Sequence, residues 1–143
     1  MARGIPKEVI QHFEAVPLFV SVSKKGLRSI ILAATEVDVR AGKVLVEEGE
    51  WGREMYVILR GTAEVKRGGR KLRELFPGDF FGEMAFLAPA RRTATVTARS
   101  DMRVMVLDSR AMGQIVETEP AVARRLLAAM AERIRATERS EVH

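Results

Sequence analysis

Cysteine is absent from the 143-residue chain, which excludes disulfide bonds and thiolate metal ligands. Histidine is nearly absent: one lies at position 12, within a segment of helical pattern, and the other is the terminal residue. A cupin-type metal centre needs several histidines on its strands, and a Ser-His-Asp arrangement would have to use one of these two peripheral residues. We therefore expect no metal site, no catalytic residues, no cofactor and no enzymatic activity.

Long hydrophobic runs are also missing. No apolar stretch approaches the roughly 18 residues that cross a bilayer, and residues 1–15 lack the continuous apolar core of a secretion signal. The composition, with 47% hydrophobic and 30% charged residues, is that of an ordinary folded domain. We expect a single domain over residues 1–143, no membrane segment and a cytoplasmic location.

Acidic residues are outnumbered by basic ones, and the formal net charge is +5. The excess lies in the last helical segment and in "KRGGRK" at residues 66–71, where Gly68 and Gly69 predict a hairpin turn with a solvated tip. Basic residues distributed in this way do not predict a nucleic-acid partner. They do favour an anionic ligand such as a phosphate.

Helical periodicity marks the two ends of the chain. Residues 6–16 and 24–34 predict two helices, and residues 109–117 a third that Asp108 or the following serine can cap. A last helix begins near Pro120, and its final residues, "TERSEVH", are expected to fray. The apolar positions on one face of these helices are Val9, Ile10, Phe13 and Val16, then Leu27, Ile30 and Ile31, and finally Val122, Leu126, Met130 and Ile134.

Between the helical segments, short runs of strand pattern alternate with turn residues. They predict an antiparallel β-roll, jelly-roll-like, of about eight strands, and hence an α+β fold. We expect N-terminal helices over 1–34, the roll over 35–107 and two C-terminal helices over 108–137. Within the roll, apolar residues continue on both faces of the strand at 55–59, so this strand is expected to be covered on both sides.

The stretch "FGEMAFLAPARRTATVTA", residues 81–98, places charges of both signs beside an apolar run. Residues 83–87 predict a single helical turn whose free N–H groups could bind an anion, and an arginine in the following loop could grip a phosphate. Glu83 would repel a phosphate unless it accepts a hydrogen bond from another part of the ligand, such as a sugar hydroxyl. The two signs together therefore indicate a nucleotide. The alternative is a carboxylate that complements a helix N-terminus and a solvated pair, Arg91 and Arg92.

These residues resemble the cyclic nucleotide-binding domain family. "FGEMAFL" and "RTATV" are similar to the two halves of that family's phosphate-binding cassette, which would span 81–94 here. Upstream, "AGKVLVEEGEWGREMYVILRGTAEV" resembles a second characteristic block. Its glycines at turn positions are Gly42, Gly49, Gly52 and Gly61. The resemblance covers nearly the whole chain and implies the β-roll fold described above.

The resemblance also implies roles for individual residues. Arg92 would bind the cyclic phosphate and Glu83 the ribose 2′-hydroxyl, while Thr93 would offer its hydroxyl to the phosphate or the base. Backbone contacts would come from Gly82, Met84 and Ala85. Many members carry proline before the arginine, whereas this chain has Arg91, so the arginine that faces the ligand stays open. We favour Arg92 because it directly precedes "TAT".

The last helix would close over the purine as a lid. Candidate lid residues are Leu127, Met130 and Ile134, which could cap the base, and Arg133 or Arg135, which could stack on it. The alternative is a core position, because an apolar row at helical spacing more often packs into the core.

The resemblance implies a sensor of cAMP, in preference to cGMP, that signals to an effector protein or to an output domain of a parent protein. One alternative is a protein-interaction domain that keeps the roll without binding nucleotide. Another is the excised regulatory domain of a channel, kinase or transcription factor, which would use the same ligand chemistry.

Overall fold

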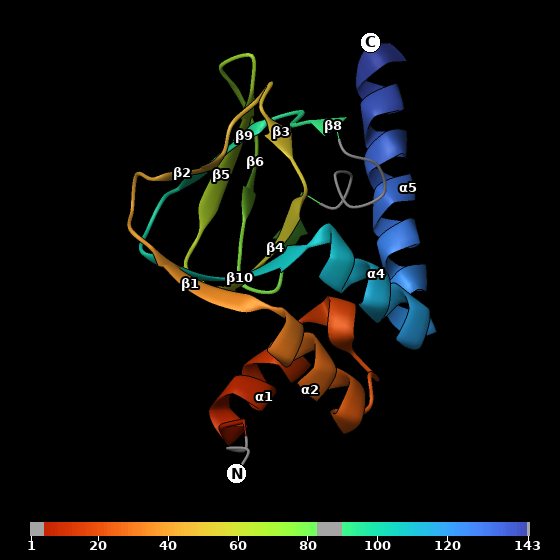
Figure 1. Ribbon diagram of the computed structural model, residues 1–143. Helices are drawn as coiled ribbons and strands as arrows, with labels where there is room; N and C mark the ends of the chain where they lie inside the picture. Colours follow the sequence, from red (N-terminus) through yellow and green to blue (C-terminus); the bar gives the residue numbers. More distant parts are fainter. Residues whose placement is uncertain (1–4, 83–89, 143) are drawn as a thin grey trace.

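The computed structural model describes residues 5–82 and 90–142. Its architecture is the predicted α+β fold, an antiparallel β-roll with helices packed against one side (Figure 1). The N-terminal helices lie beneath the roll in this view, and the long C-terminal helix rises along its flank. No helix of the described residues combines the length and the apolar character needed to cross a membrane.

Five helical segments are described, and two of them begin at side-chain caps. The Ser23 hydroxyl accepts a hydrogen bond from the Gly26 N–H at 3.0 Å, and the Asp108 carboxylate accepts one from the Ala111 N–H at 2.8 Å. The segments are α1 (Lys7–Glu14), the 3₁₀ turn η1 (Pro17–Phe19), α2 (Lys24–Ala33), α4 (Ser109–Thr118) and α5 (Pro120–Val142). The last of these, α5, continues to Val142, beyond the expected boundary at residue 137, because no glycine or proline interrupts the segment.

Ten strands occur among the described residues, against the eight or so predicted. Two four-stranded sheets, β1-β10-β4-β7 and β2-β9-β5-β6, form the roll, and β3 and β8 pair as a separate ribbon. The extra strands include two-residue pairings, which are too short to show alternation in a sequence. The bounds are β1 (Thr35–Val39), β2 (Val44–Val46), β3 (Trp51–Gly52), β4 (Glu54–Arg60), β5 (Ala63–Arg67), β6 (Arg70–Leu75), β7 (Phe80–Phe81), β8 (Ala90–Arg91), β9 (Thr95–Ala98) and β10 (Met102–Asp108).

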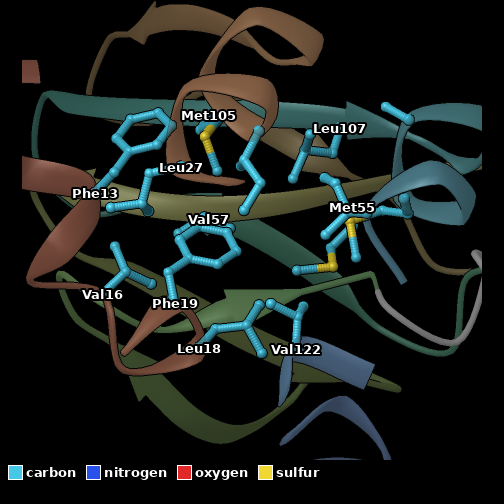
Figure 2. Packing of buried hydrophobic residues seen from close by; sticks show 14 of the residues in the cluster. Phe13, Val16, Leu18, Phe19, Leu27, Met55, Val57, Met105, Leu107 and Val122 are labelled. Carbon is cyan, nitrogen blue, oxygen red and sulfur yellow. The ribbon is translucent and has the colours of Figure 1, made fainter. Parts of the chain in front are cut away.

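Two hydrophobic clusters lie on opposite faces of β4 and β10. The helix-side cluster joins Met55 and Val57 of β4 to the helices, as Figure 2 shows. The roll cluster fills the space between the two sheets, with Ile58 from β4 and Val104 from β10. The predicted covering of β4 on both faces is therefore confirmed, because alternate side chains of a strand point to opposite sides.

The members of each cluster come from many elements. The helix-side cluster comprises Phe13, Val16, Leu18, Phe19, Leu27, Ile30, Met55, Val57, Met105, Leu107, Ala111, Met112, Ile115, Val122 and Leu126. The roll cluster comprises Val39, Val46, Ile58, Ala63, Val65, Leu75, Phe81, Val96, Ala98, Met102 and Val104.

The first half of α5 is anchored to the helical layer. Val122 and Leu126 are buried in the helix-side cluster, and the Arg125 guanidinium donates a hydrogen bond to the Leu18 carbonyl at 3.0 Å. The predicted apolar row does not stay on this face, because Ile134 is 52% exposed. Four residues turn a helix by about 400°, so each step drifts by about 40° and three steps carry Ile134 about 120° away from Val122.

Candidate ligand-binding site

The β3–β8 ribbon fixes the backbone on either side of the arginine pair. Trp51 pairs with Arg91 and Gly52 with Ala90. Directly after β8, the Arg92 N–H donates to the Glu50 carbonyl at 2.7 Å, and the Arg92 carbonyl accepts from the Gly49 N–H at 2.9 Å. Arg92 therefore lies in a loop before β9 begins, but both of its backbone polar groups are held by the preceding turn.

The two adjacent arginines point to different surroundings. Arg91 is exposed; its Nη1 donates to the Gly49 carbonyl at 2.8 Å, and its guanidinium carbon lies 5.2 Å from the ring centroid of Trp51. The Arg92 side chain instead lies against the backbone of Gly52 and Gly82. Of the two, Arg92 is thus the arginine that turns toward the glycines of the ribbon and of the predicted cassette.

The Arg92 guanidinium carries a polar group with no acceptor within residues 5–82 and 90–142. Its Nη1 is buried and has no hydrogen-bond partner among the described residues. At Gly82, which has a φ of +85°, a Cβ atom would lie 2.9 Å from this Nη1. The close approach of the guanidinium therefore depends on the missing side chain, and φ itself favours glycine at this position.

Tyr56, on β4, is in the electrostatic range of Arg92. Burial raises the pKa of the Tyr56 hydroxyl, the charge of Glu54 raises it further, and the charge of Arg92 lowers it. The Tyr56 ring stacks on Phe81, with centroids 4.8 Å apart and planes at 7°. Tyr56 also borders the roll cluster.

This arrangement suits an anion. A buried donor that finds no acceptor costs about 1–3 kcal/mol, and an anionic ligand can supply the missing acceptor. Arginine is suited to the role because it stays charged and presents its donors in a rigid fork. In contrast, no group of three or more His, Asp or Glu side chains within residues 5–82 and 90–142 is placed to hold a metal ion.

The other predicted cassette residues divide into two groups. Glu83, Met84 and Ala85, together with the predicted helical turn at 83–87, lie outside the described residues. Thr93 is described: its side chain is exposed, and its carbonyl accepts a hydrogen bond from Arg67 Nε at 3.0 Å. The basic hairpin tip thus reaches the loop that carries Arg92.

The predicted lid residues on α5 differ in burial. Met130 is buried, whereas Leu127 is 61% exposed and Ile134 also faces solvent. Arg135 pairs with Glu132 at 3.0 Å. The side chain of Arg133 lies outside the described part of the chain. Met130 is thus buried without belonging to either hydrophobic cluster, whereas Leu127 and Ile134 are open to solvent.

Sequence reasoning missed two residues of this site. Gly52 was expected at a turn, but it lies in β3 and its φ is not positive. Tyr56 was expected only as part of a covered strand. A signal for Gly52 exists in principle, because a strand glycine can mark a close backbone approach. No comparable signal singles out Tyr56.

Comparison with known proteins gives a consistent result. A family model described as "Cyclic nucleotide-binding domain" matches residues 36–119. The chain is 34% identical over 113 residues to a cyclic nucleotide-gated potassium channel of Mesorhizobium japonicum, covering 79% of this chain and 31% of the channel. It is 27% identical over 125 residues to a CRP-like cAMP-activated global transcriptional regulator of Mycobacterium tuberculosis, covering 84% and 56%.

A solved structure agrees with these relatives. The crystal structure of the catabolite activator protein of Thermus thermophilus superposes with a TM-score of 0.79 at 27% identity, covering 87% of this chain and 61% of that one. The chain thus spans between about a third and three fifths of the length of these three proteins.

Proposed function

Because the chain belongs to the cyclic nucleotide-binding domain family, we propose that it is a regulatory module that binds cAMP, in preference to cGMP, through Arg92. The family match covers more than half of the chain and includes both the ribbon and the arginine pair. The relatives described above include a transcriptional regulator and a channel, which are regulated proteins rather than metabolic enzymes.

The observation that carries this proposal is the buried Nη1 of Arg92, which has no hydrogen-bond partner in the part of the chain that the structure describes. A cyclic phosphate supplies two exocyclic oxygens, and one of them can accept the hydrogen bond that Nη1 does not make within the described residues. Arg91 is already engaged with Trp51 and Gly49, which supports Arg92 as the phosphate ligand.

The remaining contacts follow the cassette pattern. Glu83 would accept a hydrogen bond from the ribose 2′-hydroxyl, which explains a carboxylate beside a phosphate site. Met84, Ala85 and Gly82 would contribute backbone groups. Thr93, whose side chain is exposed beside Arg92, would offer its hydroxyl to the phosphate or to the base.

Isothermal titration calorimetry with cAMP and cGMP tests the proposal. We expect a Kd in the micromolar range or below for cAMP and weaker binding of cGMP. Arg92→Ala should weaken cAMP binding by about 1.5–3 kcal/mol, or roughly 10- to 150-fold, because a charge-assisted hydrogen bond is lost. The matched variant Arg91→Ala should change the Kd by less than about threefold, the scale of a weak exposed contact.

Two outcomes would contradict the proposal. If neither nucleotide binds, the domain is instead a protein-interaction module on the same fold. If Arg91→Ala is the more damaging variant, the phosphate is read by the other arginine. Thr93→Ala separates the two roles of its hydroxyl: equal loss for both nucleotides indicates the phosphate, and loss for cGMP alone indicates a contact to guanine.

The signal would pass through α5. Its first half is anchored by Val122, Leu126 and Arg125, while Leu127 and Ile134 are exposed and available to cover the base. If cAMP binds more tightly to the protein with α5 in one of two positions, its binding would shift α5 toward that position and so change the output. The output would lie in an effector protein or a further domain, because the relatives are longer than this chain.

The absence of cysteine allows a direct test of this movement. Spin labels at Lys43→Cys and Glu132→Cys report the distance between an exposed turn of the roll and α5. We expect cAMP to shift that distance distribution and 5′-AMP to leave it unchanged. Calorimetric binding of cAMP without a shift would reject the lid mechanism and leave the binding function intact.

A further inference from the structure

The backbone conformation at Gly52 does not require glycine. Seven described glycines have a positive φ, which favours glycine over other residues, but Gly52 is not among them. It lies in β3, paired with Ala90 in regular antiparallel register. Strand geometry is open to any L-residue and disfavours glycine, because glycine loses more conformational entropy on ordering. Another constraint must explain glycine at this position.

That constraint is the Arg92 side chain. A Cβ atom built on Gly52 would fall on the Arg92 guanidinium, with Nε, Cζ and Nη2 as its nearest neighbours. The overlap involves the part of the side chain that would bind the phosphate, not its aliphatic stem. A methyl group at position 52 and the present guanidinium position therefore exclude each other.

Arg92 cannot relieve this overlap by moving its backbone alone. Its N–H is bound by the Glu50 carbonyl and its carbonyl by the Gly49 N–H, both from the turn that leads into Gly52. Any shift of this loop would also break the strand pairing of Trp51 with Arg91. Rotation about the side-chain torsions of Arg92 costs less free energy than moving this loop. The guanidinium is therefore the group that would turn away.

We propose that Gly52 is a positioning residue for ligand binding: the missing side chain leaves the space in which the Arg92 guanidinium is held toward the ligand. This inference rests on the proposed function of Arg92. Gly82 borders the same guanidinium, but its φ of +85° and the Glu54 carbonyl, 2.6 Å from its would-be Cβ, also require glycine there. At Gly52, in contrast, a substitution tests only the space beside the Arg92 guanidinium, because no positive φ requires glycine there.

A double-mutant cycle tests the inference. The four proteins are the original chain, Gly52→Ala, Arg92→Ala and the combination, each titrated with cAMP. We expect Gly52→Ala to raise the Kd at least tenfold in the original chain and less than about twofold in the Arg92→Ala background, because the contact it disturbs is then gone. Gly113→Ala is the matched control, since a Cβ at this helical glycine would meet nothing within 4 Å.

Trp51 provides a second readout, because it is the only tryptophan and precedes Gly52. Its emission should be the same in Gly52→Ala as in the original chain if the ribbon is intact and only Arg92 has turned. A shifted emission together with lost binding would mean that the methyl group opens the ribbon, and would overturn the inference. Unchanged cAMP binding by Gly52→Ala, or equal loss with and without Arg92, would overturn it as well.

Failure of the proposed function gives a different pattern. If the original chain binds no cyclic nucleotide, the same four proteins are compared by thermal unfolding. Gly52→Ala should then lower the unfolding midpoint in the original chain and raise it slightly in the Arg92→Ala background, where alanine is favoured over glycine in a strand. Such coupling without binding would retain Gly52 as the residue that positions Arg92 and reject only the ligand. Absence of coupling in both measurements would reject the positioning role.

Discussion

The helix-side cluster and the roll cluster are built on opposite faces of the same two strands, β4 and β10, but their boundaries differ. The helix-side cluster is closed by four helices and a 3₁₀ turn. The roll cluster ends at Phe81, and the next residue, Gly82, borders a guanidinium whose Nη1 has no acceptor in the described part of the chain. One face of the sheet thus has the character of a structural core, and the other combines a core with the proposed phosphate site. Substitutions on the two faces should therefore separate stability from binding.

The largest effect is expected within the helix-side cluster. Phe19 is buried there and stacks with Phe13, with ring centroids 6.3 Å apart. Phe19→Ala should lower the free energy of unfolding by about 3–5 kcal/mol, because it removes a large apolar side chain and leaves a cavity. Chemical denaturation measures this change.

Phe76 is the matched control for Phe19, since it is the same residue type at 50% exposure. Phe76→Ala should change the free energy of unfolding by no more than about 0.5 kcal/mol. Similar losses for both variants would mean that burial does not distinguish the two positions and that the helix-side cluster is not the dominant core.

The next effect has the opposite sign and lies at the edge of the roll cluster. Arg92→Met replaces the guanidinium by an apolar group and removes Nη1, a buried donor with no partner among residues 5–82 and 90–142. We expect the ligand-free protein to become more stable by about 1 kcal/mol, because the cost of an unsatisfied buried donor is relieved. Binding of cAMP should weaken as in Arg92→Ala, so stability and affinity would change in opposite directions.

Arg91→Met is the control within the same dipeptide. It removes the contact with Trp51 and the hydrogen bond to Gly49, so it should destabilise the protein by about 0.5–1 kcal/mol. Thermal unfolding of both variants without ligand gives the comparison. A loss of stability in Arg92→Met would show that this guanidinium has a structural partner and does not await a ligand.

These adjacent arginines also show how far the sequence predicts the structure. The roll and its flanking helices follow from periodicity, because β4, β10 and the helices are long enough for their apolar pattern to be read. Which of the two arginines points toward the site cannot be predicted in this way. Neighbouring residues in an extended chain point to opposite sides, and the pairing of the ribbon decides which side each one faces. That ribbon consists of two pairs of residues and leaves no pattern.

The lid prediction marks a second limit. The row from Val122 to Ile134 has constant four-residue spacing, yet its first members are buried and its last is exposed. Spacing alone cannot say where the helical layer ends and α5 runs beyond it. The predicted roles of Glu83, Met84 and Ala85 stay predictions, because these residues lie outside the described ranges.

A smaller difference is expected between two helical glycines. Replacing glycine by alanine inside a helix usually stabilises a protein by about 0.5–1 kcal/mol. Gly113→Ala in α4 should show this gain, since a Cβ there meets no neighbour. Gly26→Ala in α2 should not, because its Cβ would lie 2.6 Å from the Glu119 carboxyl carbon. Chemical denaturation of the two variants compares them directly.

Removing the obstacle provides the control for Gly26. In a Glu119→Ala background, Gly26→Ala should regain the ordinary stabilisation, because the carboxylate that occupies the space is gone. Glu119 lies between α4 and α5, so this contact ties the start of α5 to the N-terminal helices. A full gain from Gly26→Ala in the original chain would show that Glu119 moves aside freely and does not fix that junction.

The smallest effect concerns the turn that holds the backbone of Arg92. The protonated Glu50 carboxyl donates a hydrogen bond to the Glu47 carboxylate, and this bond together with the negative charge of Glu47 raises the pKa of Glu50 above its ordinary value of 4.5. A raised pKa in the folded state means that the contribution of Glu50 to stability is fully present below the unfolded pKa and is lost as pH rises through the folded pKa.

In Glu47→Gln the pKa of Glu50 should fall toward its ordinary value, and NMR titration of the side-chain carboxyls measures it. Glu8→Gln, on α1, should leave Glu50 unchanged. Because both carboxyls are on the surface, cAMP affinity at neutral pH should not change, and a changed affinity would place this turn inside the binding site rather than behind it.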